Sequence, residues 1–349
     1  MDNTAQASPT PASSPRVLVR AAVKVTATVA AAGLAALLAA GATPARADAA
    51  PRRTLWVAAG AGCSDGAAGT RTSPLCGINR AAALAKPGDT ILIRAGRYAG
   101  TLAPRRSGRP GAPISFTAAG PGVTIAAAGR PTGINLIGVH DLRFTGLTVT
   151  GAGGKGVWVS RSARIVFSHV TVRANRGPGV QLKQSRDVTI DHSTISANRG
   201  AGIMELGGVT RGRYTASTIG GNGHDGRAFN GDGVILNGSG ALVRGDTITG
   251  NGDHRLYEHG IYASRRASGY LIVGNRLAGN SATGVKAQGS GSVRANSFGS
   301  SRFAIWVDAS SRTGVAISGN AFKGTFARTV ATGAGARVRL NGNHVTRAD

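Results

Sequence analysis

Short apolar segments alternate along the chain with glycine and asparagine at a regular spacing. A glycine followed by valine or isoleucine recurs at intervals of roughly 20–30 residues, at Gly156, Gly179, Gly202, Gly233, Gly260 and Gly284. An asparagine recurs in phase with these pairs, at Asn175, Asn198, Asn222, Asn251 and Asn280. Self-similarity at such a period predicts a solenoid of stacked coils.

The apolar segments have the length and alternation of short β-strands. Val188–Ile190 is followed closely by Ser193–Ile195, and the same unit recurs at Leu242–Ile248, Leu271–Leu277 and Val315–Phe322. Glycine and asparagine between them tolerate the left-handed backbone of sharp corners. Because no coil holds a helix-length amphipathic segment, leucine-rich and helical repeats are excluded. We expect an all-β fold, a right-handed parallel β-helix.

The N-terminal part of the predicted solenoid has a different pattern. Ile78–Ala85 reads as a short amphipathic helix that Pro87 and Gly88 stop. Asp89–Ile93 is the first strand expected after it, and Pro113–Phe116 and Val123–Ile125 follow. Such a helix would cover the open end of the apolar core. Residues 54–100 are therefore expected to form a cap and the first coils.

The first 47 residues read as a targeting segment. Arg16, Arg20 and Lys24 precede an apolar run of 16 residues, Val25–Ala40, and small residues close the segment at Thr43–Ala47. This run is short for a membrane span and typical of a secretory signal peptide, although an uncleaved anchor is the alternative. We expect a secreted protein, extracellular or held at the cell wall, without stable membrane association. Residues 48–349 would form one domain.

The chain has two cysteines, Cys63 and Cys76, in a stretch rich in glycine and serine. In an oxidising compartment they are expected to form a local disulfide. Two cysteines supply too few ligands for a metal site of their own.

Two stretches of the N-terminal part resemble a known group. Residues 55–98, with Lys86-Pro-Gly-Asp-Thr-Ile-Leu-Ile93 at their centre, look like the cap of secreted β-helix proteins, and Gly108–Phe116 resembles their first full coil. The group includes chondroitinase-B-like and alginate-lyase-like polysaccharide lyases. The resemblance implies the fold. It only suggests the activity, because hydrolases, epimerases and non-catalytic proteins share this scaffold.

The charge of the chain favours an acidic partner. The net charge is +26, and +23 is left when residues 1–47 are removed. Such a field attracts polyanions, although a base-composition bias of the genome would also enrich arginine. No RNA- or DNA-reading motif accompanies the charge. We expect an acidic polysaccharide as partner, no nucleic acid, and a monomeric chain.

Two coils are longer than the others. Their insertions, residues 223–232 and 252–259, occupy the same place in adjacent coils and would project from one face, which in repeat proteins often binds the ligand. Tolerated surface loops are the alternative. The insertions collect polar side chains suited to chemistry, namely His224, Asp225, Asp232, Asp253, His254, Tyr257, Glu258 and His259.

Strand alternation predicts a row of outward side chains beside these loops. It consists of the residues two places after each repeat glycine, namely Trp158, Gln181, Met204, Ile235, Tyr262 and Lys286, with Trp306 in the next coil. Tyr262, Lys286 and Trp306 would lie on consecutive coils. In a second row, made of the residues before each glycine, Asp232 would lie next to His259.

For an acidic polysaccharide the simplest reaction is β-elimination, which needs a base near the carbon beside a carboxylate and a cation to neutralise that carboxylate. We expect Lys286 or His259 as the base and Tyr262 as the proton donor. The predicted carboxylate clamps are Arg255 and Arg265. The residues predicted to bind sugar are Trp306, Trp158, His254 and Tyr257. Asp232 with Asp225 or Glu258 would hold a possible Ca²⁺ ion.

Other interpretations stay open at this point. Lys286 would be an ordinary solvated lysine, Asp232 lies in a good turn sequence, and the direction of Glu205 is not settled. Lys155 and Lys183 rank lower because acids and aromatics do not surround them. The competing functions are a uronate epimerase, a non-catalytic glycan-binding protein, and a glycoside hydrolase with a carboxylate pair drawn from Asp225, Asp232, Glu258 and Asp308.

Overall fold

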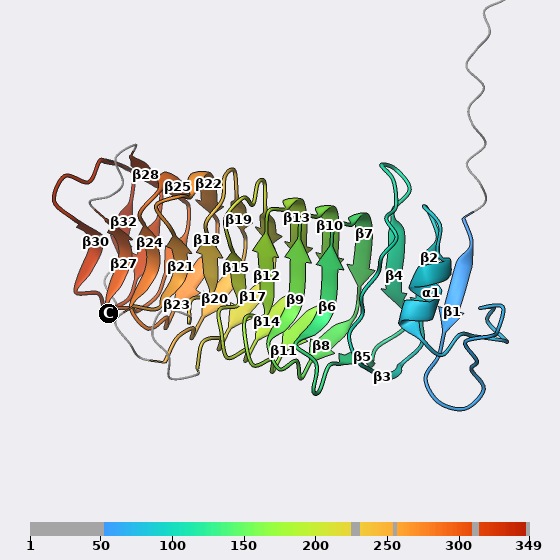
Figure 1. Cartoon of the computed structure of the whole chain (residues 1–349). Coiled ribbons are helices and arrows are strands. Elements are labelled where there is room, and N and C mark those ends of the chain that lie inside the picture. The colour runs from blue at the N-terminus through green and yellow to red at the C-terminus, as the bar shows by residue number, and fades with distance from the viewer. Residues whose placement is uncertain (1–51, 225–230, 254–256, 309–313, 347–349) are drawn as a thin grey trace, which may run out of the picture. The chain divides into compact units, whose positions relative to one another are not determined.

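The computed structural model describes residues 52–224, 231–253, 257–308 and 314–346. Residues 50–349 form one compact unit, separate from residues 1–49. The chain of this unit winds through about ten turns and crosses three parallel sheets, here sheets A, B and C (Figure 1). The predicted right-handed parallel β-helix is therefore confirmed. Residues 1–47, the predicted signal peptide, lie outside the described part.

Each sheet gains about one strand per turn, and every pairing between neighbouring strands is parallel. Sheet A consists of β1 (Thr54–Val57), β2 (Thr90–Ile93), β4 (Ile114–Ala118), β7 (His140–Thr145), β10 (Ala163–Ser168), β13 (Arg186–Asp191), β16 (Arg213–Thr215), β19 (Leu242–Arg244), β22 (Ser268–Val273), β25 (Ser290–Arg294), β28 (Val315–Ser318) and β31 (Val338–Asn341). Sheet B consists of β3 (Gly96–Ala99), β5 (Val123–Ala126), β8 (Thr148–Thr150), β11 (Thr171–Arg173), β14 (Thr194–Ser196), β17 (Thr218–Gly220), β20 (Thr247–Thr249), β23 (Arg276–Ala278), β26 (Ser297–Phe298), β29 (Ala321–Lys323) and β32 (His344–Thr346). Sheet C consists of β6 (Thr132–Ile137), β9 (Lys155–Ser160), β12 (Val180–Lys183), β15 (Ile203–Glu205), β18 (Val234–Leu236), β21 (His259–Ala263), β24 (Thr283–Ala287), β27 (Phe303–Val307) and β30 (Arg328–Thr332).

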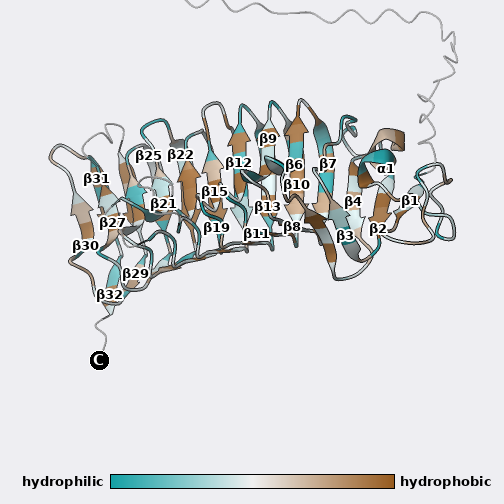
Figure 2. Cartoon of the chain, turned by 60° about the horizontal axis from the view of Figure 1, so that its bottom comes forward, coloured by the Kyte–Doolittle hydropathy of each residue, from teal (hydrophilic) through white to brown (hydrophobic). Residues whose placement is uncertain are grey.

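The core fills the space between the three sheets. Side chains alternate along each strand, so that Val157 and Val159 of β9 are buried while Trp158 between them faces outward. Equivalent side chains stack from coil to coil, as in the ring series Phe116, Phe144 and Phe167, with centroids 4.8 and 5.0 Å apart. The apolar segments in Figure 2 fall on strands of all three sheets. One continuous apolar core therefore runs through the solenoid.

Buried asparagines turn one corner of the coils. In the predicted series from Asn175 to Asn280, each side-chain amide donates to the side-chain oxygen of the next asparagine at 2.8–3.0 Å. A second ladder links Asn275, Asn296, Asn320 and Asn343 in the same way. Asn320 therefore belongs to a different corner from Asn280, which settles the register of the last coils.

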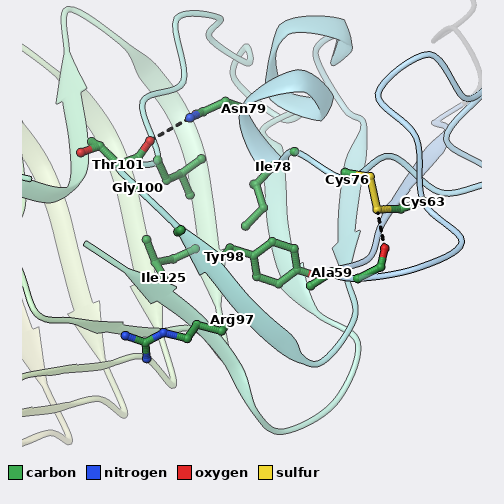
Figure 3. Close-up of a pocket in the computed structure, with 14 residues that line it drawn as sticks. Ala59, Cys63, Cys76, Ile78, Asn79, Arg97, Tyr98, Gly100, Thr101 and Ile125 are labelled. Atoms are coloured by element: carbon green, nitrogen blue, oxygen red, sulfur yellow. Dashed lines mark hydrogen bonds between the residues drawn. A yellow bond between two sulfur atoms is a disulfide. The ribbon is translucent and has the colours of Figure 1, made fainter. Parts of the chain in front are cut away.

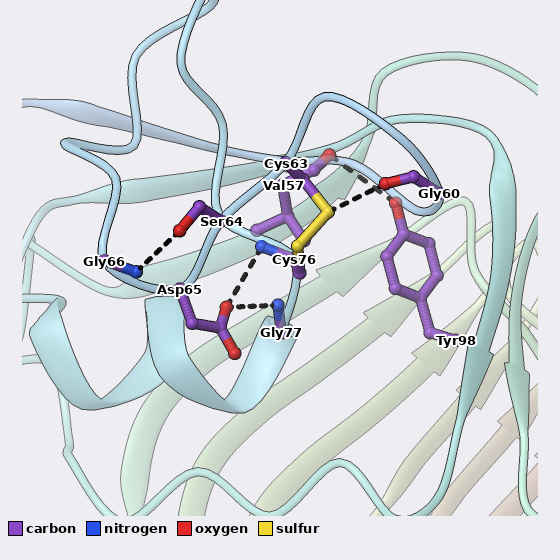
Figure 4. The surroundings of a disulfide bond; sticks show 9 residues. All are labelled: Val57, Gly60, Cys63, Ser64, Asp65, Gly66, Cys76, Gly77 and Tyr98. Carbon is purple, nitrogen blue, oxygen red and sulfur yellow. Dashed lines mark hydrogen bonds between the residues drawn. A yellow bond between two sulfur atoms is a disulfide. The ribbon is translucent and has the colours of Figure 1, made fainter.

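A short helix and a disulfide close the N-terminal end. Helix α1 (Ile78–Leu84) lies where the sequence predicts it and buries Ile78 against the core. The predicted disulfide joins Cys63 to Cys76 (Figure 4). The carboxylate of Asp65 accepts the backbone N–H groups of Cys76 and Gly77 at 3.0 and 2.7 Å, which fixes the entry into the helix.

Within the described ranges, no helix has the length and apolar character that a membrane crossing needs.

Candidate functional site

The predicted outward row is confirmed on sheet C. Its members pair in unbroken register from one coil to the next, in the order Trp158, Gln181, Met204, Ile235, Tyr262, Lys286 and Trp306. The residues on either side of each member point into the core, as Ile261 and Ala263 do beside Tyr262. Side chains more than a hundred residues apart in sequence therefore share one face.

Three members of this row form a compact group that we call the C-terminal cluster: Tyr262, Lys286 and Trp306. The ammonium of Lys286 lies 5.9 Å from the ring centroid of Tyr262 and 5.1 Å from that of Trp306. All three side chains are half-buried, and each comes from the middle of a paired strand, β21, β24 or β27. A cation held between two aromatic rings suits a sugar ring that carries a carboxylate.

An open depression of about 410 Å³ adjoins this cluster. Its lining consists of Asn237, Tyr262, Ser264, Arg265, Arg266 and Gln288. The hydroxyl of Tyr262 donates to the side-chain oxygen of Gln288 at 2.7 Å, and the amide of Gln288 donates to Asp308 at 3.1 Å. Burial raises the pKa of Tyr262, so its hydroxyl keeps its proton at neutral pH. The structure thus brings the predicted clamp Arg265 and the predicted donor Tyr262 to one depression.

Asp232 and His259 meet on adjacent coils, as their row predicts. The backbone N–H of His259 donates to the carboxyl of Asp232 at 2.8 Å, and the imidazole lies 6.0 Å from the ring of Tyr262. Each of the two side chains is only 2% exposed. Burial raises the pKa of Asp232 to about 8 and lowers that of His259 to about 3. Both groups are therefore uncharged at neutral pH.

The two long connections end in paired strands, β18 and β21, so their described ends lie side by side. Glu258 is fully buried and accepts the backbone N–H of Asp253 at 2.8 Å, whereas the side chain of Tyr257 is 52% exposed. The predicted site residues Asp225, His254 and Arg255 lie outside the described residues.

The calcium prediction rests on Asp232 and Glu258 in the described part of the chain. In that part, no group of three or more histidine, cysteine, aspartate or glutamate side chains is arranged to hold a metal ion. One oxygen of Asp232 already accepts the backbone N–H of His259. These residues alone do not fit Ca²⁺, which prefers several charged oxygens.

The expectation that Lys155 has no aromatic neighbour was wrong. Its ammonium lies 5.3 Å from the ring centroid of Trp158, so it does have an aromatic neighbour. The same spacing of three residues also brings His259 to Tyr262, across Gly260, and Phe303 within 5.4 Å of Trp306, across Ala304. That recurring spacing was present in the sequence and would have identified the pair.

Glu205 points into the core. Its carboxyl accepts the hydroxyl of Tyr214 at 2.7 Å and the backbone N–H of Asn237 at 3.0 Å. Burial raises the pKa of Glu205. Because Asn237 also lines the depression, this buried pair supports the floor behind the site.

A second concavity of about 380 Å³ lies beside the N-terminal disulfide (Figure 3). Ile78, Tyr98 and Ile125 contribute apolar surface to it, and the hydroxyl of Tyr98 donates to the backbone oxygen of Arg94 at 2.8 Å. Its lining includes no carboxylate and no imidazole. The groups needed for acid–base chemistry therefore gather on sheet C rather than here.

The comparisons with known proteins agree with the architecture. The model of the family described as "Right handed beta helix region" matches residues 132–322, and that described as "Pel9A-like, right handed beta helix region" matches residues 57–202. A comparison with curated protein sequences gives no match.

Three solved structures illustrate the likeness in fold. An alginate lyase from Paenibacillus sp. str. FPU-7 is 16% identical, with 84% of this chain and 99% of that chain covered and a TM-score of 0.55. Pectate lyase Pel9A is 17% identical, with 81% and 78% covered and a TM-score of 0.55. A glycoside hydrolase is 9% identical, with 83% and 96% covered and a TM-score of 0.62.

Proposed function

This chain belongs to the right-handed β-helix family, and from that membership and the side chains on sheet C we propose that it is a carbohydrate-active protein, a polysaccharide lyase. The substrate would be an acidic, uronate-containing polysaccharide, cleaved by β-elimination. The disulfide between Cys63 and Cys76 supports secretion, which the predicted signal segment also requires.

The observation that carries this proposal is the C-terminal cluster. Two aromatic rings on one flat face offer stacking surfaces to sugar rings, and the ammonium of Lys286 lies between them. Arg265 lines the adjoining depression and supplies a second cation. Parallel strands in register hold Tyr262, Lys286 and Trp306, so this part of the site is organised before substrate binds.

The proposed reaction assigns one role to each group. Arg265 pairs with the uronate carboxylate and stabilises the negative charge that develops there. Lys286, in its neutral form, accepts the proton from the carbon beside that carboxylate. The released electron pair forms a carbon–carbon double bond as the bond to the leaving sugar oxygen breaks. Tyr262 gives its proton to that oxygen, and the products are an unsaturated uronate and a new chain end.

Lys286 is preferred to His259 as the base. His259 is 2% exposed, and its low pKa of about 3 makes it a weak base. A hydrolase is less well supported because Asp232 and Glu258, two of the four carboxylates considered, are buried. The calcium ion stays a prediction, and no step above depends on it.

Ultraviolet absorbance of unsaturated products on polygalacturonate, alginate and glycosaminoglycans tests the reaction. The wild type should give signal on at least one polymer. Lys286→Ala and Lys286→Arg should both lose at least about a hundredfold, because an arginine keeps the charge but cannot act as a base. Lys183→Ala, on the exposed side of β12, is the matched control and should keep full activity.

Each outcome separates the competing functions. An active Lys286→Arg variant would show that Lys286 only binds the carboxylate. New reducing ends without unsaturation would identify a hydrolase instead. Binding of a polymer without any product would identify a non-catalytic protein. Absence of both product and binding on all the polymers would refute the proposal as a whole.

A further inference from the structure

A second lysine–aromatic pair lies at the other end of the outward row. We call Lys155 and Trp158 the N-terminal pair. The ammonium of Lys155 lies 5.3 Å from the ring centroid of Trp158, both side chains are half-buried, and both belong to β9 of sheet C. We propose that this pair is a second binding site for the acidic polysaccharide, so that one polymer chain spans both sites. This inference rests on the proposed function.

The register of the strands fixes how far apart the two sites are. From Trp158 to Lys286 the row advances by five coils, through Gln181, Met204 and Ile235 and then Tyr262. At the ordinary spacing of neighbouring strands this is about 24 Å along the solenoid axis. A pyranose unit advances an extended glycan by roughly one coil spacing. An oligomer of several sugars can therefore reach both sites, whereas a disaccharide cannot.

The floor between the two sites suits a polymer that lies along it. The intervening members of the row are Gln181, Met204 and Ile235, none of which carries a charge. Gln181 is nearly buried, and its amide donates to the sulfur of Met204 at 3.0 Å. None of these three side chains therefore repels a carboxylate or projects as a long charged group. The sugar rings would lie over a flat surface between a cation at either end.

The two sites should not influence each other electrostatically, but a polymer that contacts both should bind more tightly than one that contacts a single site. At about 24 Å their lysines are separated by more than the Debye length of about 8 Å, so neither affects the charge of the other appreciably. When one site holds a polymer, the second contact becomes intramolecular, which can raise the affinity by a factor of about 10²–10⁴. Short fragments gain nothing from the second site. The pair therefore predicts a preference for long chains.

Binding assays with polymers and short fragments of one substrate test this inference. Polygalacturonate and alginate, with the disaccharide of each, would be titrated by calorimetry against variants that also carry Lys286→Arg, which prevents turnover but keeps the cation of the first site. Trp158→Ala and Lys155→Glu should weaken polymer binding at least about tenfold and leave disaccharide binding unchanged. Lys155→Arg should keep most of the affinity. Lys183→Ala, which removes the exposed lysine of β12 in the next coil, is the matched control.

Two results would overturn the second site. One is polymer binding by Trp158→Ala and Lys155→Glu that equals that of the Lys286→Arg parent. The other is an equal loss for polymer and disaccharide, which would mean that the pair only supports the fold. Circular dichroism checks folding, and Lys155→Glu keeps the test valid if Trp158→Ala unfolds. If the variants lose polymer binding but the wild type forms no unsaturated product, the second site stands and the lyase reaction is wrong.

Discussion

The asparagine ladder permits a quantitative prediction about the stability of the coils. Asn222 lies in the middle of the ladder and is fully buried. Its amide donates to the backbone oxygen of Ile195 at 2.9 Å and to the side chain of Asn251 at 3.0 Å. Its oxygen accepts the backbone N–H and the side-chain amide of Asn198 at 3.2 and 3.0 Å. One side chain therefore makes four hydrogen bonds between three coils.

The change Asn222→Ala removes all four hydrogen bonds and leaves the buried groups that made them without these partners. At about 1 kcal/mol net for each bond, the free energy of unfolding should fall by about 4 kcal/mol. Asn343, at the end of the second ladder, makes three comparable bonds but is only half-buried, so water can replace them. Asn343→Ala should therefore cost about 1 kcal/mol.

Urea unfolding followed by circular dichroism measures both changes. The midpoint should fall clearly for Asn222→Ala and only slightly for Asn343→Ala, with similar slopes if each variant unfolds in one step. Thr194→Ala, on the exposed surface of β14, controls for the substitution itself. A loss for Asn222→Ala that is no larger than for Asn343→Ala would show that these bonds do not determine the stability of the coils.

Three further predictions concern buried groups. Because the pKa of Asp232 is raised from 3.8 to about 8, its contribution to stability is complete below about pH 4 and is lost as the pH rises through 8. Asp232→Asn should flatten the fall in Tm between about pH 4 and 8. Tyr214→Phe should lower the free energy of unfolding by about 1–3 kcal/mol, measured in urea, because Glu205 loses its donor. Replacing Cys63 and Cys76 by serine should cost at most about 3 kcal/mol, detectable as faster proteolysis of the cap; an unchanged rate would show that the disulfide does not hold it.

Much of the fold follows from the sequence because each coil repeats the same local rules. A strand with alternate apolar residues must turn its other side chains to solvent, and one repeat glycine per coil sets the register. These two facts were enough to place Trp158, Tyr262 and Lys286 in one row, as the strand pairing confirms. The asparagine ladder was visible for the same reason.

Contacts between side chains were harder to predict than rows. Glu205 follows Ile203 with inward parity, but a carboxyl inside a core needs a partner, and Tyr214 lies nine residues further on in another sheet. The sequence pattern ranks Lys155 low for lack of neighbouring acids and aromatics, whereas its ammonium contacts the ring of Trp158 across a glycine within one strand. Alternation alone does not describe the backbone at that glycine, so the sequence pattern missed a contact that the structure shows.

Asp232 and His259 lie at a position that small apolar residues occupy in the two preceding coils. The residues before the repeat glycine in the two preceding coils are Pro178 and Ala201, which carry no polar side-chain atom. In the two long coils the same row holds Asp232 and His259, whose burial makes their charged forms unfavourable. Small apolar residues occupy the same structural position in the two preceding coils, so the position does not by itself require a polar side chain. Natural proteins break local rules of this kind mainly at functional sites. The buried pair beside Tyr262 therefore favours a site at this end of sheet C independently of the aromatic cluster.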